Sequence, residues 1–118
     1  MSVLVVEDHA DLREMLAVLL ECEGFRVRTA ANGVEALARL GESRPSLILL
    51  DLMMPVMNGD QFRECQLADP RFSDVPVICI TAAHDGRLRA ERMHATAYFQ
   101  KPVDFDRLLG VVREYTLD

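Results

Sequence analysis

Positive charge is scarce in this sequence relative to negative charge. Thirteen lysine and arginine residues stand against 19 aspartate and glutamate residues, which leaves a formal net charge of −6 over 118 residues. A surplus of negative charge repels a phosphate backbone and an anionic membrane surface. The composition therefore argues against direct nucleic-acid binding and against membrane association.

Cysteines are few, and long apolar runs are missing. Cys22, Cys65 and Cys79 form neither an even-numbered disulfide framework nor a spacing typical of zinc ligands. They fit small buried hydrophobic residues in a reducing compartment. No apolar stretch approaches the roughly 18 residues of a membrane span, and the acidic Glu7 and Asp8 follow closely on the first residue. We predict a cytoplasmic protein.

Repeats, linkers and low-complexity tracts are also missing. Half of the residues are hydrophobic and 27% are charged, a balance typical of a packed domain and too apolar for a disordered segment. We predict one domain over residues 1–118, because a chain of this length buries a sizeable core. The chain begins with methionine and ends shortly after the last predicted helix, so a stand-alone protein and a piece of a longer protein both stay open.

Short aliphatic runs alternate with stretches of helical periodicity. Asp11 and Glu14 are spaced like a capping pair at the first amphipathic stretch, and Asn58 and Asp104 are placed to cap later ones. Strands are predicted at residues 3–6, 25–29, 47–50, 77–80 and 97–99. Helices are predicted near residues 11–23, 34–40, 59–68, 86–93 and 104–115.

The regular alternation of strand and helix indicates the fold class. Five such repeats joined by short connections favour a parallel sheet with right-handed crossovers and helices on both faces. We therefore predict an α/β fold with a doubly wound, five-stranded parallel sheet. Ligands bind beyond the carboxyl ends of the strands in such sheets, so that edge is the place to look for function.

Polar side chains follow four of the predicted strands where each strand ends. These residues are Glu7 and Asp8, then Asp51, Thr81 and Lys101. If the first and third strands are neighbours, three carboxylates share one pocket, and each like-charged pair costs about 3–4 kcal/mol at ~4–5 Å with an effective dielectric near 20. Lys101 supplies one compensating charge. Oxygen ligands in a site open to water suit Mg²⁺, which keeps several of its waters.

The same residues are suited to phosphoryl chemistry. Carboxylates form aspartyl phosphates, so Asp51 is the natural nucleophile, while Mg²⁺ and Lys101 spread the charge of the transferred group and the Thr81 hydroxyl can bond to it. Each residue alone has a simpler explanation: Asp51 as a turn cap, Glu7 with Asp8 as a solvated helix start, Lys101 as part of a surface loop. Their joint occurrence at successive strand ends favours a site.

Four motifs spread over essentially the whole chain, VLVVEDH, LILLDLMMPVMNG, ICITAA and AYFQKPV, resemble those of the receiver domains of two-component response regulators. The resemblance implies a flavodoxin-like (βα)5 three-layer sandwich with strand order 2-1-3-4-5, similar to the chemotaxis regulator. It also implies a cis peptide bond between Lys101 and Pro102.

The resemblance also implies roles for individual residues. Mg²⁺ would be bound by Glu7, Asp8, Asp51 and the backbone carbonyl of Met53. Asp51 would accept the phosphoryl group, and Thr81 and Lys101 would contact it. Tyr98 matches the aromatic residue that swings inward when the threonine is drawn to the phosphoryl group, so Thr81 and Tyr98 would form the switch.

The implied function is a phosphorylation-activated signalling switch that catalyses only its own phosphorylation and dephosphorylation. The phosphoryl donor would be a histidine kinase or a phosphotransfer protein. A downstream protein or output domain would read the face made by the fourth helix, fifth strand and fifth helix, and a phosphorylation-dependent homodimer stays open. On that face the helix at 86–93 offers Leu88 and Met93 as its clear apolar anchors. Its local basic strip, made by Arg87, Arg89 and Arg92, fits a solvated surface as well as a surface that docks a partner.

The chain departs from the family pattern at some positions. His94 stands where a glycine usually precedes the fifth strand. Met53 and Ala83, two residues after Asp51 and Thr81, are apolar where some relatives carry polar groups that can orient a hydrolytic water. We therefore predict slow self-dephosphorylation.

Two other functions fit part of the pattern. A Mg²⁺-dependent phosphohydrolase with an aspartyl nucleophile resembles a pattern with a second aspartate two residues on, where this chain has Met53. A receiver-like interaction module that is never phosphorylated would not need the full set of site residues. A thioether copper site at Met53, Met54 and Met57 is less favoured than apolar cover for a loop.

Overall fold

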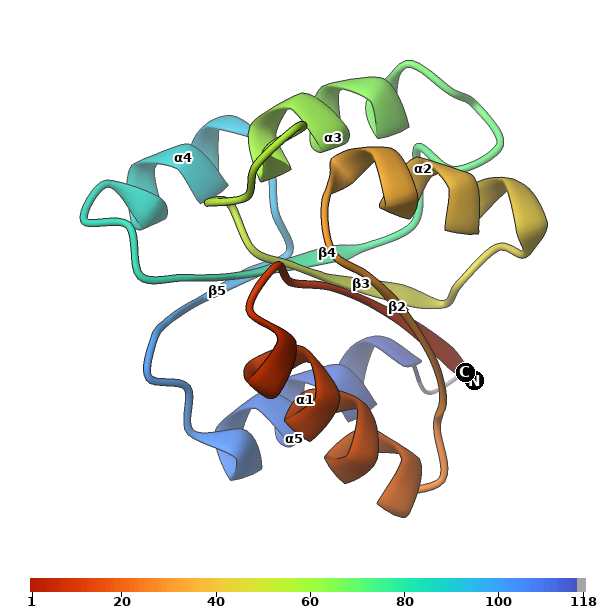
Figure 1. The fold of residues 1–118 in the computed structure, drawn as a ribbon, viewed down its shortest axis with the longest axis vertical. Helices are drawn as coiled ribbons and strands as arrows, with labels where there is room; N and C mark the ends of the chain where they lie inside the picture. The colour runs from red at the N-terminus through yellow and green to blue at the C-terminus, as the bar shows by residue number, and fades with distance from the viewer. Residues whose placement is uncertain (117–118) are drawn as a thin grey trace.

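One parallel sheet between two layers of helices makes up the computed structural model, which describes residues 1–116 (Figure 1). In that range the strands are β1 (Ser2–Val6), β2 (Arg26–Ala30), β3 (Leu47–Leu50), β4 (Val77–Thr81) and β5 (Ala97–Gln100). The helices are α1 (Ala10–Cys22), α2 (Gly33–Glu42), α3 (Gly59–Leu67), α4 (Gly86–Arg92) and α5 (Phe105–Thr116). The strand order is β2-β1-β3-β4-β5 and each neighbouring pair is parallel, so the predicted fold class is confirmed.

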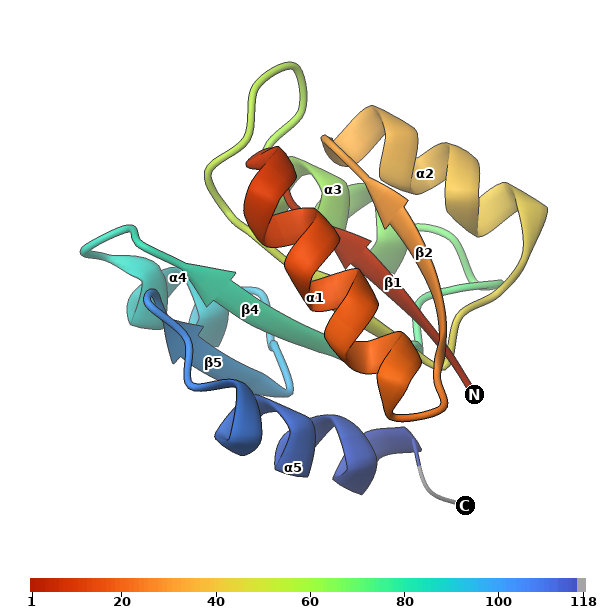
Figure 2. The same ribbon diagram turned by 60° about the horizontal axis from the view of Figure 1, so that its bottom comes forward.

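The direction of winding explains how the helices divide between the two faces. α1 and α5 lie on one face of the sheet, and α2, α3 and α4 lie on the other (Figures 1 and 2). α1 connects β1 to β2 and leads away from β3, whereas α2 connects β2 to β3 and leads in the opposite direction along the sheet. Because both crossovers are right-handed, α1 and α2 lie on opposite faces. The winding reverses between β1 and β3, and the carboxyl ends of these strands mark the usual ligand position. Within residues 1–116, no helix combines the length and apolarity that a membrane crossing requires.

β1 and β3 are buried on both faces of the sheet. Val3 and Val5 join the core beneath α1 and α5, whereas Leu4 and Val6 join the core beneath α2, α3 and α4. All residues of β3 are likewise buried. A strand that is covered on both sides has no polar face, which is why these segments are continuously apolar in the sequence.

Two helices begin at their predicted caps. The Asn58 side chain accepts the N–H of Gln61, whose side chain bonds back to the Asn58 N–H in a complete capping box. At the start of α5, the Asp104 carboxylate accepts the N–H groups of Asp106 and Arg107. Both caps satisfy N–H groups that have no partner within the helix.

The predicted capping pair of the first helix, Asp11 with Glu14, is wrong. α1 begins at Ala10, and the ring of His9 accepts the N–H of Leu12. The chain turns into the helix directly after the strand-end residues, so His9 is the residue with an extended backbone and a side-chain acceptor at the first turn. Asp11 instead lies inside the first turn, where its charge favours the helix dipole.

α4 is attached to the sheet differently from the prediction. Met93 is buried as expected, but Leu88 is 48% exposed, and Gly86 and Ala90 are the buried residues within the helix. Ala90 and Met93 are three residues apart and share a face, whereas Leu88 points elsewhere. His94 ends this region with a φ of 56°, the left-handed conformation that glycine usually supplies.

Candidate functional site

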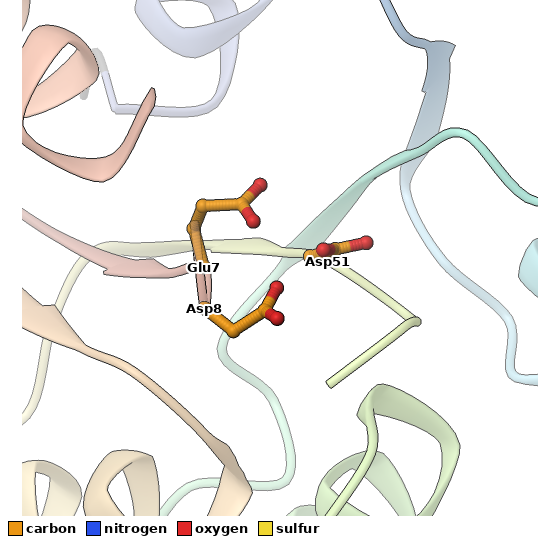
Figure 3. Close-up of side chains that lie close together, drawn as sticks. All are labelled: Glu7, Asp8 and Asp51. Atoms are coloured by element: carbon orange, nitrogen blue, oxygen red, sulfur yellow. The ribbon is translucent and has the colours of Figure 1, made fainter. Parts of the chain in front are cut away.

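β1 and β3 end side by side and bring three carboxylates to one place. Val6 is paired with Leu50 in the sheet, so the residues that follow, Glu7 and Asp51, leave neighbouring strands together. Asp8 follows Glu7, and one oxygen from each of the three carboxylates lies within 4.8 Å of the others (Figure 3). Glu7 and Asp51 are buried, at 2% and 3% exposure, while Asp8 is exposed to solvent.

Lys101 lies between two of these carboxylates. Its Nζ is 2.6 Å from a Glu7 oxygen and 3.2 Å from an Asp51 oxygen. Its backbone N–H donates to the Thr81 carbonyl at 2.9 Å, and its bond to Pro102 is cis, as the resemblance implied. Burial lowers the pKa of Lys101, but the hydrogen bond to Glu7 and the charge of Asp51 outweigh burial and raise it, so the ammonium stays protonated. We call this group the acidic cluster: Glu7, Asp8, Asp51 and Lys101.

The acidic cluster holds more negative than positive charge. Three carboxylates face one ammonium group. Burial raises the pKa of Glu7 to about 7, and the charge of Asp51 adds to this rise, against hydrogen bonds from Lys101 and from the His9 N–H. A carboxyl group that resists ionisation at neutral pH is the expected result of burial next to a like charge. The cluster is therefore suited to take up a further cation.

The oxygen donors fit a hard divalent cation. The carboxylates of Glu7, Asp8 and Asp51 converge from two strand ends, and exposure on the Asp8 side lets an ion keep water ligands. Met53, the fourth predicted ligand through its carbonyl, lies on the adjoining loop, and its N–H donates to an Asp51 oxygen at 3.2 Å. This set of donors matches the preference of Mg²⁺ for oxygen ligands.

Two residues that sequence reasoning did not assign, Arg13 and His9, hold the acidic pair in place. One Arg13 nitrogen donates to the Glu7 carbonyl at 2.9 Å and to the Asp8 carbonyl at 3.4 Å. The His9 N–H donates to the Glu7 carboxylate at 3.1 Å. The spacing offered a signal for Arg13, because a residue one turn after His9 lies on the same side of α1 and faces back toward the strand end.

The loop after Asp51 runs close to the strand end. A Cβ at position 59 would lie 2.6 Å from the Asp51 carbonyl oxygen, so Gly59 allows an approach that no other residue permits. Met54 and Met57 pack against the core beneath α2, α3 and α4, and Met53 is 57% exposed. These positions fit apolar cover of the loop.

Thr81 adjoins the acidic cluster, and Tyr98 lies beyond Thr81 on the neighbouring strand β5. Thr81 is fully buried at the end of β4, and its hydroxyl accepts the Ala83 N–H at 3.2 Å. Tyr98 lies on β5, half-buried, with the Arg87 guanidinium 5.6 Å from its ring centroid. The structure thus brings four of the predicted site residues into one cluster and connects Thr81 to it through the backbone bond from Lys101.

A hollow of about 460 Å³, open to solvent, adjoins Lys101. Its walls come from the first turns of α1 and from the segment after β5, and they are mostly apolar. The lining residues are His9, Leu12, Met15, Lys101, Pro102 and Val103. The hollow leaves room for a molecule to approach the acidic cluster from the side of α1.

The family model for the response regulator receiver domain matches residues 3–113. This chain belongs to that family. The receiver domain is therefore a module of two-component signal transduction, and its acidic cluster fits the phospho-aspartate site of a phosphorylation-activated switch.

Curated relatives agree with this assignment. Response regulator Rre1 of Synechocystis is 36% identical over 115 residues, which cover 95% of this chain and 50% of that protein. The DNA-binding response regulator MtrA of Mycobacterium tuberculosis is 45% identical over 113 residues, which cover 94% of this chain and 48% of that protein. The receiver domain thus spans about half the length of these relatives.

Solved structures of other receivers have the same fold. Response regulator TrrA from Thermotoga maritima, in complex with Mg²⁺ and BeF, is 31% identical with a TM-score of 0.85, and each chain covers 97% of the other. Chemotaxis response regulator CheY4 of Vibrio cholerae is 29% identical with a TM-score of 0.88 and the same mutual coverage of 97%.

Proposed function

We propose that residues 1–118 form a single receiver domain in which Asp51 accepts a phosphoryl group from a histidine kinase or phosphotransfer protein. The observation that carries this proposal is the buried Asp51 carboxylate, held at the end of β3 within reach of two further carboxylates and of Lys101. Both oxygens of the Asp51 carboxylate have partners that position it: the Met53 N–H and Lys101.

The transfer itself requires little covalent chemistry from the protein. An Asp51 oxygen attacks phosphorus, the bond from phosphorus to the donor imidazole nitrogen breaks, and the imidazole keeps the electron pair and takes up a proton from solvent. Lys101 turns its ammonium group from Glu7 toward the new phosphoryl oxygens. Glu7, Asp8, Asp51 and the Met53 carbonyl would hold Mg²⁺, which would supply positive charge to the same oxygens.

The switch step starts from Thr81. Its hydroxyl oxygen accepts the Ala83 N–H, and a phosphoryl group on Asp51 offers a charged acceptor to which the hydroxyl can donate its proton. Movement of Thr81 vacates space for the Tyr98 ring, which changes the surface of α4, β5 and α5 that a downstream protein or output domain reads. A reversal from 1:99 to 99:1 needs about 5.5 kcal/mol of differential binding, which a dianion held by two cationic groups and a hydroxyl can supply.

The hollow beside Lys101 suits the approach of the donor. Its mostly apolar walls and the 49% exposed side chain of Met15 can bury part of a partner next to the acidic cluster. A protein donor brings its phosphohistidine to Asp51 from this side, whereas a small donor such as acetyl phosphate needs no such surface.

Intact mass spectrometry after incubation with Mg²⁺ and acetyl phosphate tests the proposal. We expect a stable adduct of one phosphoryl group on the wild type and none on Asp51→Asn. Rapid turnover of many equivalents of acetyl phosphate would indicate a phosphohydrolase instead. An unmodified wild type would indicate an interaction module that is never phosphorylated.

The lifetime of the phosphoryl group offers a separate test of the site. Met53 is exposed near Asp51, and Ala83 donates only its backbone N–H to Thr81, so neither side chain can orient an attacking water. We expect Met53→Asn to shorten the half-life of the adduct several-fold, measured by intact mass after removal of the donor. An unchanged half-life would remove the reason for predicting slow dephosphorylation.

A further inference from the structure

The first residue of α4 touches both side chains of the proposed switch. A Cβ at Gly86 would lie 2.5 Å from the Thr81 methyl carbon, 2.9 Å from a Tyr98 ring carbon and 3.2 Å from the Tyr98 hydroxyl. The Thr81 side chain is fully buried, so its methyl group has no open space into which to retreat. The observed positions of Thr81 and Tyr98 are therefore compatible only with glycine at position 86.

Backbone conformation does not explain this glycine. In residues 1–116, Gly24 is the glycine with positive φ, and Gly86 lies in ordinary helical geometry. Gly41 in α2 and Gly110 in α5 are also helical, yet a Cβ at either position would meet no atom within 4 Å. Gly86 differs from these two helical glycines because of the side chains it touches, since any helical glycine sacrifices some stability relative to alanine.

The sheet order gives a direction to the contact. β4 lies between β3 and β5, so Asp51 is on one side of Thr81 and Tyr98 is on the other. When Thr81 moves toward a phosphoryl group on Asp51, it moves away from Tyr98 and from the start of α4. That movement opens space that either the Tyr98 ring or a methyl group at position 86 can enter, so an alanine there is accommodated once Thr81 has moved.

We propose that Gly86 is a positioning residue of the switch. Because glycine has no side chain, it leaves room for Thr81 and Tyr98 in their resting arrangement, and it thereby sets the population of the resting state. This inference rests on the proposed function of Thr81 and deepens it. A methyl group at position 86 raises the free energy of the resting arrangement through steric overlap, and it does not raise the free energy of the state in which Thr81 is displaced. The substitution therefore shifts the switch toward the phosphoryl-binding state.

The affinity for beryllofluoride, a phosphoryl mimic, measures this shift. In saturating Mg²⁺ we expect Gly86→Ala to bind beryllofluoride about tenfold more tightly than the wild type, because overpacking by one methyl group is relieved in the bound state. Gly110→Ala is the matched control, since it makes the same change in a helix without any contact. An affinity of Gly86→Ala equal to that of Gly110→Ala overturns the inference.

A double-mutant cycle identifies the contact. Thr81→Ser removes the methyl carbon that lies nearest to Gly86 and leaves the contact with Tyr98, so in that background the effect of Gly86→Ala on the affinity should fall well below about tenfold. An undiminished effect in the serine background overturns the steric explanation.

Stability supplies a second readout if Gly86→Ala folds poorly. The Gly86→Ala, Thr81→Ser double variant should then regain most of the lost urea midpoint, and a double variant as unstable as Gly86→Ala overturns the inference. A wild type that binds no beryllofluoride counts against the proposed function itself. If the wild type binds beryllofluoride and Gly86→Ala binds it with the same affinity, the result counts against the role of Gly86 alone.

Discussion

Two buried polar clusters in this domain are built in opposite ways. Besides the acidic cluster, Arg63 and Gln66 of α3 form a second one, with Arg63 6% exposed and Gln66 fully buried. We call this pair the arginine cluster. Arg63 donates to the Gln66 side chain at 2.8 Å, and the remaining hydrogen bonds of the pair go to the backbone carbonyls of Met93, His94, Phe72 and Val75.

The difference lies in what each cluster still lacks. The arginine cluster ties α3 to the end of α4 and to the segment before β4, and every one of its contacts is an acceptor matched to a donor. The acidic cluster holds three carboxylates against one ammonium and keeps the pKa of Glu7 raised by burial. A saturated network stabilises a fold, whereas an unbalanced one is ready for a ligand.

Loss of Arg63 should have the largest effect on stability. Arg63→Ala leaves buried acceptors on Gln66 and on the end of α4 without a donor, so we expect the unfolding free energy to fall by about 4 kcal/mol in urea titrations. Arg71→Ala is the matched control. The Arg71 side chain is 72% exposed, so its removal should lower the unfolding free energy by less than about 1 kcal/mol. The folded fraction of Arg63→Ala should still be phosphorylated. Equal losses for the two variants would contradict the comparison.

The acidic cluster should respond to pH and Mg²⁺ where the arginine cluster does not. The pKa of Glu7 is about 7 in the folded domain against 4.5 for the free group, so the folded state holds a proton between these values. The resulting stabilisation is fully present below pH 4.5 and is lost as the pH rises through about 7.

Without Mg²⁺, the unfolding free energy of the wild type should therefore rise by about 3 kcal/mol relative to that of Glu7→Gln when the pH falls from about 8 to about 4.5. Each pKa unit contributes roughly 1.36 kcal/mol to this rise. Urea titrations of both proteins across this range provide the measurement. Saturating Mg²⁺ should abolish most of the difference, because the cation favours the ionised carboxylate. If the unfolding free energies of the wild type and Glu7→Gln change in parallel with pH in the absence of Mg²⁺, the pKa of Glu7 is not raised.

Asp51→Asn should stabilise the Mg²⁺-free domain while it abolishes phosphorylation. One of three crowded negative charges disappears, and the loss of one contact with Lys101 offsets part of the gain, so we expect about 1 kcal/mol of added stability. Differential scanning calorimetry with and without Mg²⁺ should also show a smaller stabilisation by the ion in this variant. A lower melting temperature without Mg²⁺ would mean that the carboxylates are already balanced.

The smallest expected effect concerns two strained backbones, one near each cluster. Val56, in the loop after Asp51, has a φ of 68°, and His94, beside Arg63, has a φ of 56°. A β-branched side chain tolerates this conformation less well than histidine does. Val56→Gly should therefore raise the unfolding free energy by about 1 kcal/mol, whereas His94→Gly should leave it almost unchanged. Thermal melts of the two variants provide the measurement. A larger gain at position 94 would contradict this ranking.

The parts of the fold that follow from chain periodicity could be predicted from the sequence. β3 was predicted with its observed bounds, because a strand covered on both faces has to be apolar throughout. The acidic cluster could be predicted because parallel strands deliver the residues after them to one edge, so Glu7, Asp51 and Lys101 meet although they lie far apart in the chain.

Features that depend on contacts between distant elements escaped prediction. Arg63 is an ordinary charged helix residue until the end of α4 covers it, and Asp85-Gly86 reads as an ordinary turn signal that does not reveal the contact of Gly86 with Thr81. The exposure of Leu88 depends on which face of a seven-residue helix meets the sheet, and so short a helix shows too little periodicity to decide it.

The identity of the modified residue tests the central claim most directly. After incubation with acetyl phosphate and Mg²⁺, borohydride reduction converts an aspartyl phosphate to homoserine, and peptide mass spectrometry then locates it. We predict homoserine at position 51 alone, with no conversion when Mg²⁺ is chelated. Conversion at Glu7 or Asp8, or an unmodified Asp51 in a folded and Mg²⁺-bound domain, would contradict the account.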